Sequence, residues 1–128
     1  MAERQIPAPP VNPETQEWWD ACKEGKFLIP KDNSNGEMFW YPRKNSPLTG
    51  SSDIGWVEAS GEGVIYSHST LWRADPPYCL AYVTLSEGVT VMSNIVDTDF
   101  KDVKIGQKVK LVFKEATDGH PVPCFTPA

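Results

Sequence analysis

The second half of the chain, residues 56–128, alternates short β-rich segments with turn residues. The segments read WVEASGEGVIYSHSTLW, YCLAYVTL, VTVMSNIV and QKVKLVFKEA, and a last one, expected at an edge, surrounds Cys124 and Phe125. The glycines of GEG (61–63) and SEG (86–88) are typical of a bend and of a tight hairpin. Strands of this number and length, with no helical pattern between them, predict a five-stranded Greek-key barrel of the OB type. A small sandwich is the alternative.

A short helix is predicted ahead of this barrel, in NPETQEWWDACKEGK. Asn12 suits the N-cap, Pro13 suits the first helical position, and Gly25 is a natural stop. Trp18 and Trp19 are adjacent in this short helix. We therefore expect one ring to pack inward and the other to lie at an edge or at an interface.

The sequence predicts three parts in total. The first, residues 1–25, is a proline-rich arm followed by the helix, and the arm is expected to be extended and frayed. The second, residues 26–55, places the predicted strands KFLIP and EMFWYPR on either side of the turn KDNSNG, which is a hairpin pattern. The third, residues 56–128, is the predicted barrel.

Composition limits the classes of partner. The chain has 128 residues and a net charge of −5, so it gains little from contacts with phosphates. Binding of single-stranded nucleic acid by an OB module is kept as the alternative function. The opening residues lack the apolar core of a signal peptide, and no apolar run reaches the ~20 residues of a membrane span. We therefore expect a cytoplasmic protein without membrane contact and with reduced thiols.

Few residues suit catalysis. No pair of Cys or His has the spacing of zinc ligands, so no metal site is predicted. The three cysteines are far apart in sequence, and only His68 and His120 are available as bases. A small enzyme acting on CoA thioesters through His68 stays open as a third hypothesis. We expect no catalytic residue and no cofactor bound by this chain.

The order of these pieces resembles a known family over nearly the whole chain. The matching stretches are EWWDACKEGKFLIP, GEMFWYPR, GWVEASGEGVIYSHSTL, PPYCLAYVTLSEG and VKIGQKVKLVF. They resemble the family catalogued as domain of unknown function 35, whose members join an N-terminal helix, a rubredoxin-like zinc ribbon and a C-terminal OB-fold. The resemblance therefore implies a mainly β protein made of a helix, a ribbon and a five-stranded barrel.

The sequence departs from the family at the ribbon. The family places four cysteines as two C-x2-C pairs ten residues apart, and the matching positions here are Asp32, Asn35, Ser46 and Thr49. All four are turn-forming residues and poor zinc ligands, so we expect a zinc-free ribbon held by packing and hydrogen bonds. The segment from Phe39 to Arg43 is then expected to serve as a docking surface.

The resemblance implies a non-catalytic companion of a thiolase-superfamily acyl-CoA enzyme. Such an enzyme is a retro-aldolase or an acyltransferase, in steroid side-chain or other lipid breakdown, and the companion helps to form its acyl-CoA channel. A hetero-oligomer with that enzyme is expected, and an acyl-CoA hydratase is a further partner of such proteins. The residues expected to contact the partner are Trp18, Trp19, Phe39, Trp40, Tyr41, Arg43, Trp72 and Tyr78. The residues to test for CoA contact are Arg43, Lys44 and Arg73.

Overall fold

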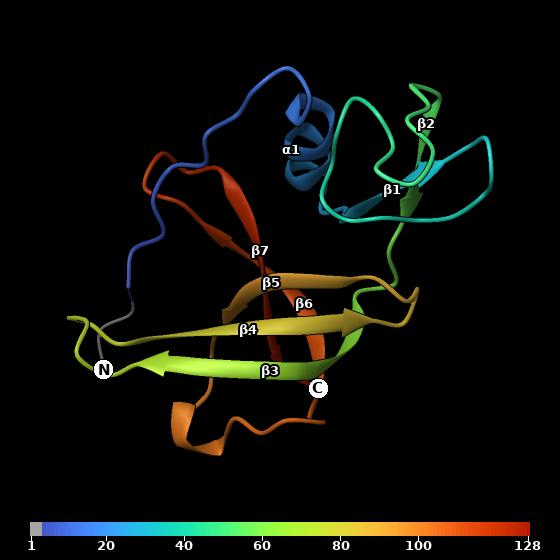
Figure 1. Cartoon of the computed structure of the whole chain (residues 1–128). Coiled ribbons are helices and arrows are strands. Elements are labelled where there is room, and N and C mark those ends of the chain that lie inside the picture. Colours follow the sequence, from blue (N-terminus) through green and yellow to red (C-terminus); the bar gives the residue numbers. More distant parts are fainter. Residues whose placement is uncertain (1–3) are drawn as a thin grey trace.

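The structure, a computed structural model, describes residues 4–128. Figure 1 shows a barrel in the lower half of the view, with one helix and a small sheet above it. Among residues 4–128, none of the helices has the length and apolar character that a bilayer crossing requires. The helices and strands, in chain order, are α1 (Gln16–Lys23), β1 (Leu28–Asp32), β2 (Ile54–Glu58), β3 (Glu62–Leu71), β4 (Tyr78–Leu85), β5 (Thr90–Ile95), the 3-10 helix η1 (Phe100–Asp102), β6 (Lys108–Glu115) and β7 (Pro121–Pro127).

The barrel confirms the predicted fold class. Strands β3 to β7 close in the order β3-β4-β5-β7-β6, and β3 pairs with β6 to complete the ring. The inward side chains of these strands form the core, and Phe125, Ile65 and Val83 are among the fully buried ones. Strand β7 is not an edge strand, because it pairs with β6 along its whole length and with β5 at Phe125.

Helix α1 begins later than the sequence predicts. Asn12 accepts a hydrogen bond from the Thr15 backbone N–H through its side chain, so it caps a turn that precedes the helix. The C-terminal stop at Gly25 is present: its φ is 76°, and the N–H of Lys26 reaches back to the carbonyl of Ala21. This reverse turn lets the chain leave the helix and enter β1.

The predicted hairpin in residues 26–55 is present only as a short antiparallel turn, because the second predicted strand does not form at its full length. Strand β1 pairs with β2 over its whole length, from Leu28 opposite Glu58 to Asp32 opposite Ile54. The second predicted strand is limited to residues 37–39. These residues meet β1 at the bridge between Lys31 and Met38 and at two hydrogen bonds, in which the Asp32 and Phe39 N–H groups donate to the carbonyls of Glu37 and Pro30. The segment from 56 onward therefore divides in two: β2 belongs to the small sheet, and the barrel begins with β3 after a bend at Gly61.

Strands β3 and β4 approach each other closely at Gly63. A Cβ at this position would lie 2.6 Å from Cγ1 of Val83 on the neighbouring strand β4. The lack of a side chain at Gly63 therefore allows β3 and β4 to pack closely where the barrel closes.

Candidate functional site

Two matching turns hold the ribbon module. The N–H of Gly36 donates to the carbonyl of Asp32 at 2.7 Å, and the N–H of Gly50 donates to the carbonyl of Ser46 at 2.9 Å. Both glycines are left-handed, with φ values of 77° and 78°. These turns begin at two of the positions where the family has zinc-binding cysteines, so the backbone layout of the metal site is kept.

A buried carboxylate lies between the two turns. Asp32 is fully buried, and it accepts hydrogen bonds from the Ser34 hydroxyl at 2.5 Å, the Thr49 hydroxyl at 2.6 Å and the Ser34 N–H at 2.9 Å. The side chains of Ser34, Ser46 and Thr49, in that order of effect, hold the pKa of Asp32 well below its usual range. The carboxylate thus joins the two turns through hydroxyl groups.

The residues at the four family positions do not fit a zinc ion. Asp32, Ser46 and Thr49 gather around the carboxylate, but Asn35 is exposed and accepts a hydrogen bond from the Glu37 N–H instead. Within residues 4–128, no group of three or more Cys, His, Asp or Glu side chains is placed to hold a metal ion. Hydrogen bonds therefore take the place of metal–ligand bonds in this module.

The aromatic residues expected at an interface separate into two groups. Trp18 and Phe39 are buried, and Trp19 and Trp40 are half-buried against the same core, so these rings are largely used inside the chain. Trp18 contacts Trp19, Phe27 and Trp40 with ring centroids 4.7–5.7 Å apart. Both tryptophans of the helix therefore pack on the core. Trp18 is buried in it, and Trp19 is half-buried against it, with its ring perpendicular to that of Trp18.

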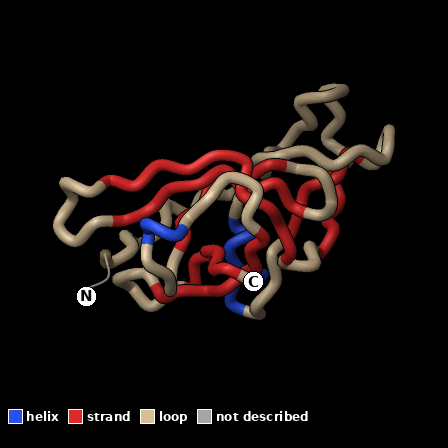
Figure 2. Tube along the Cα trace, turned by 90° about the horizontal axis from the view of Figure 1, so that it is seen from below, coloured by secondary structure: helices blue, strands red, loops and turns tan. Residues whose placement is uncertain are grey.

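The second group remains accessible. Tyr41 and Trp72 are exposed, Arg43 is exposed beside Tyr41, and Tyr78 is half-buried. Trp72 and Tyr78 flank the loop between β3 and β4, whereas Tyr41 and Arg43 belong to the ribbon. Figures 1 and 2 place these two regions at opposite ends of the molecule.

The basic residues expected to contact CoA are also divided between these ends. Arg43 and Lys44 are exposed in the ribbon, and Arg73 is exposed in the loop after β3. The structure does not bring the three together. Any CoA contact would therefore involve one end of the chain at a time.

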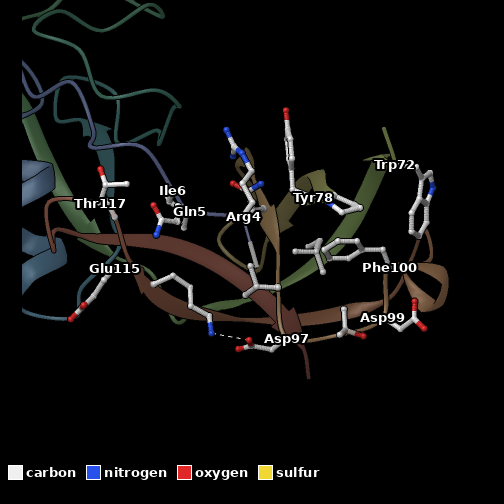
Figure 3. A pocket seen from close by; sticks show the side chains of 17 residues that line it. Arg4, Gln5, Ile6, Trp72, Tyr78, Asp97, Asp99, Phe100, Glu115 and Thr117 are labelled. Atoms are coloured by element: carbon white, nitrogen blue, oxygen red, sulfur yellow. Dashed lines mark hydrogen bonds and ion pairs between the residues drawn. The ribbon is translucent and has the colours of Figure 1, made fainter. Parts of the chain in front are cut away.

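A groove of about 690 Å³ opens at the end of the barrel near Trp72. Figure 3 shows its labelled side chains, which come from the N-terminal arm, the β3–β4 loop, the segment after β5 and the β6–β7 turn. The guanidinium of Arg4 lies 4.0 Å from the ring centroid of Tyr78, and Trp72 meets Phe100 edge-on at 6.2 Å. Lys114 and Asp97 form an ion pair at 2.7 Å.

The arm forms one wall of this groove. The carbonyl of Ile6 accepts a hydrogen bond from the N–H of Thr117 at 2.9 Å, and Ile6 bridges Ala116 in parallel. Residues 4–6 therefore lie on the barrel, where the sequence predicted a frayed arm. Sequence reasoning missed Arg4, Ile6 and Phe100, since each falls in a stretch without periodicity.

The charges of the groove do not suit a nucleic-acid backbone. Its lining carries the carboxylates of Asp97, Asp99 and Glu115 against the cations of Arg4 and Lys114. An electrostatic track for phosphates needs an excess of cations. This lining therefore disfavours the nucleic-acid alternative, although the groove includes loops that many OB-folds use for ligands.

The thiols and histidines give no support to a nucleophilic mechanism. Cys22, Cys79 and Cys124 are all buried, and none is in a disulfide. Burial raises the pKa of Cys22 to about 12 and also raises the pKa of Cys79, so both are held as neutral thiols. His68 is exposed on β3 opposite Ala81, and His120 packs its ring against Trp19.

Comparison with known proteins agrees with this architecture. Residues 56–114 match the model of the ChsH2 C-terminal OB-fold domain. The chain is also similar to a structure described as Ltp2-ChsH2(DUF35) aldolase. The TM-score is 0.84 at 29% identity, and the match covers 94% of this chain and 98% of the other.

Two curated relatives extend the match. A "DUF35 domain-containing scaffold protein" of Pyrococcus furiosus is 30% identical over 105 residues, which cover 77% of this chain and 76% of the relative. A "Probable enoyl-CoA hydratase alpha subunit" of Thermomonospora curvata is 30% identical over 127 residues, or 95% of this chain. The chain spans only 40% of the length of that second relative. On the fold, the module order and these matches, the chain belongs to the DUF35 family.

Proposed function

We propose that this chain is a non-catalytic companion subunit of a partner enzyme, and that the partner is a thiolase-superfamily acyl-CoA enzyme. The observation that carries the proposal is the fold similarity to the Ltp2-ChsH2(DUF35) aldolase, which extends over 94% of this chain. The scaffold description of the Pyrococcus furiosus relative supports the same role.

The chemistry of the chain supports a companion role over a catalytic one. A nucleophilic thiol needs a low pKa and access to substrate, and burial gives Cys22 and Cys79 the opposite properties. The ribbon keeps its turns around Asp32 although the zinc ligands are replaced. Because the module keeps its fold without the zinc ligands, we attribute its role to the surface that it presents to a partner.

The partner reaction that we propose is a retro-aldol cleavage or an acyl transfer on an acyl-CoA, in steroid side-chain or other lipid breakdown. In this complex the chain would line part of the acyl-CoA channel, with Arg43, Lys44 or Arg73 near the CoA phosphates. Each of these three residues is exposed and thus accessible to a ligand. An acyl-CoA hydratase is a second proposed partner, because the Thermomonospora curvata relative carries that description.

The decisive experiment is reconstitution with a purified thiolase-superfamily acyl-CoA enzyme from the same organism. We expect the two proteins to co-elute in size exclusion and the enzyme to lose activity when this chain is omitted. Separate elution together with full activity of the enzyme alone would overturn the proposal. The cytoplasmic location proposed for both proteins is checked by fractionating cells that express the tagged chain.

CoA contact is tested on the reconstituted complex. Arg73→Ala and the pair Arg43→Ala with Lys44→Ala should each be measured for KM of the acyl-CoA substrate, with Lys23→Ala on α1 as the control. A raised KM for one of the two sets identifies the end of the chain that meets the CoA. Unchanged KM in both sets contradicts CoA contact and leaves the companion role intact.

A further inference from the structure

The outer face of β3, β4 and β5 carries large side chains that the barrel leaves uncovered. Tyr66, Tyr82 and Met92 have exposed fractions of 68%, 49% and 60%. Tyr82 and Met92 are direct cross-strand partners. Tyr66 lies in the register shift between Ile65 and Ser67, beside Tyr82. Figure 1 shows the three strands side by side, so these residues form one row across adjacent strands.

This row continues along the same face. Val64 lies two residues before Tyr66 and is also exposed, and it pairs with Thr84 on β4. A shallow hollow of about 410 Å³ is lined there by Val64, Thr84 and Lys108, among others. The exposed Ile105 precedes Gly106, whose N–H donates to the carbonyl of Ile65 at 2.8 Å.

The composition of this face is that of an interface. Tyrosine and methionine are enriched at the centres of protein interfaces, whereas isolated apolar residues on a surface need no explanation. Here four exposed side chains, Val64, Tyr66, Tyr82 and Met92, share one side of one sheet. Contiguous apolar surface of this kind marks a contact site in a soluble protein.

Lysines lie along one side of this face, on β6 and in the turn before it, although the chain as a whole is acidic. Lys108 pairs with Val64 across β6 and β3, and Lys110 pairs with Glu62. Lys104 lies in the turn that leads into β6, beside Ile105. Three lysines against one carboxylate give this face a positive rim on a chain whose net charge is −5.

The positive charge of the rim indicates which kind of protein surface can bind this face. A contact between two copies would bring together two faces that each carry an excess of lysine, and this like charge disfavours association. A partner with an apolar centre ringed by Asp and Glu would be complementary.

We propose that this face, defined as Val64, Tyr66, Tyr82 and Met92 with the rim of Lys104, Lys108 and Lys110, docks on an acidic-rimmed apolar surface of the partner enzyme. The inference rests on the companion function proposed above. It assigns the main contact to the barrel wall, whereas the contacts predicted from the sequence lie on the helix, on the ribbon and at Trp72 and Tyr78 beside the β3–β4 loop.

The test compares three variants of the full chain in binding to the thiolase-superfamily enzyme used in the reconstitution above. The first carries Tyr66→Ser, Tyr82→Ser and Met92→Ser, the second carries Lys108→Glu and Lys110→Glu, and the control carries Lys23→Ser, an exposed position on α1. Because all the changed side chains are exposed, circular dichroism and thermal unfolding should stay close to those of the unaltered chain. These measurements confirm that each variant is folded.

We expect the first variant to raise Kd at least 10-fold, mainly through faster dissociation. The second should slow association and flatten its dependence on salt, as expected for rim charges. The Lys23→Ser control should bind as the unaltered chain does. Binding of the first variant with unchanged Kd would overturn the docking face while leaving the companion function standing.

Two further outcomes separate the proposals. If the unaltered chain does not bind the enzyme at all, the companion function fails, and the docking assignment fails with it. If light scattering shows that the chain alone is a dimer and the first variant is a monomer, the face belongs to a second copy, which overturns the assignment to a partner enzyme.

Discussion

Thr49 donates a hydrogen bond of 2.6 Å to the buried carboxylate of Asp32, and this bond joins two turns that begin 14 residues apart in the sequence, at Asp32 and Ser46. In relatives with four cysteines, a metal ion would make the equivalent connection. Here a charge-assisted hydrogen bond performs it, and such bonds are stronger than those between neutral groups.

Removal of this bond should loosen the ribbon. Thr49→Val keeps the shape of the side chain and deletes the donor, so we expect a loss of about 1.5 kcal/mol in the free energy of unfolding. Ser52→Ala, in the same loop, is the matched control and should have little effect. Urea denaturation of both variants checks the prediction, and equal midpoints would show that the bond contributes no stability.

Acid should weaken the same cluster. The pKa of Asp32 lies below its ordinary value of 3.8, so the charged carboxylate stabilises the fold above about pH 4, and this stabilisation is lost as the pH falls toward the lowered pKa. At pH values below 4, we expect the unaltered chain to unfold at a lower midpoint concentration of urea. Asp32→Asn should be less stable at pH 7 and should lose less on acidification, and a parallel pH profile would contradict this account.

The metal-binding layout should be recoverable. The variant that carries Asp32→Cys, Asn35→Cys, Ser46→Cys and Thr49→Cys presents four thiols on turns that already have the required form, so we expect it to bind one zinc ion with tetrahedral thiolate ligands. A chelator should then lower its Tm, whereas the Tm of the unaltered chain should not respond. Metal analysis showing stoichiometric zinc in the unaltered chain would refute the zinc-free ribbon.

The buried and exposed tryptophans should differ sharply in their effect on stability. The indole N–H of Trp18 donates to the carbonyl of Leu28 at 2.7 Å, and its ring packs in the core, so Trp18→Ala should cost about 3–5 kcal/mol. Trp72 is 54% exposed, and Trp72→Ala should cost under about 1 kcal/mol. Thermal unfolding of the two variants provides the comparison, and similar losses would mean that α1 is not anchored through Trp18.

The close approach of β3 and β4 predicts a steric effect at Gly63. Gly63→Ala would place a Cβ 2.6 Å from Cγ1 of Val83, and we expect a loss of about 1–3 kcal/mol. Val83→Ala removes the clashing methyl groups, so the double variant should lose less than the sum of the two single losses. Additive losses in this double-mutant cycle would show that the two side chains do not compete for space.

The barrel was predictable because its strands carry their own pattern. Alternation in residues 108–114, glycines at 61–63 and the turn at 86–88 are local signals, and β6, the bend before β3 and the β4–β5 hairpin all follow them. The last strand was misplaced at an edge, since closure of a barrel depends on pairing between segments that are distant in sequence. Ile95 on β5 pairs in parallel with Phe125 on β7, although β6 lies between the two strands in the sequence.

The ribbon shows why local pattern fails elsewhere. Phe39 follows a turn and is apolar, so its segment is typical of a partner strand for β1. It meets β1 only around the bridge between Lys31 and Met38, and residues 54–58 form the full partner strand. The family spacing located Asp32 and Thr49, but it did not predict that Asp32 would be the shared acceptor. The groove and the exposed face of β3 to β5 were missed for a related reason: Arg4, Tyr66 and Met92 come from separate segments.

The five-stranded barrel could be predicted from turn chemistry and strand pattern, which are properties of neighbouring residues. The family, the ribbon and the replacement of its zinc ligands followed from the resemblance to a known family. Which aromatic side chains are buried became clear from the tertiary structure alone. Trp18 and Phe39 are covered by their own core, whereas Tyr82 and Met92 remain open to a partner. Burial depends on contacts between distant segments, and a strand's own sequence does not record which of its faces the rest of the chain will cover.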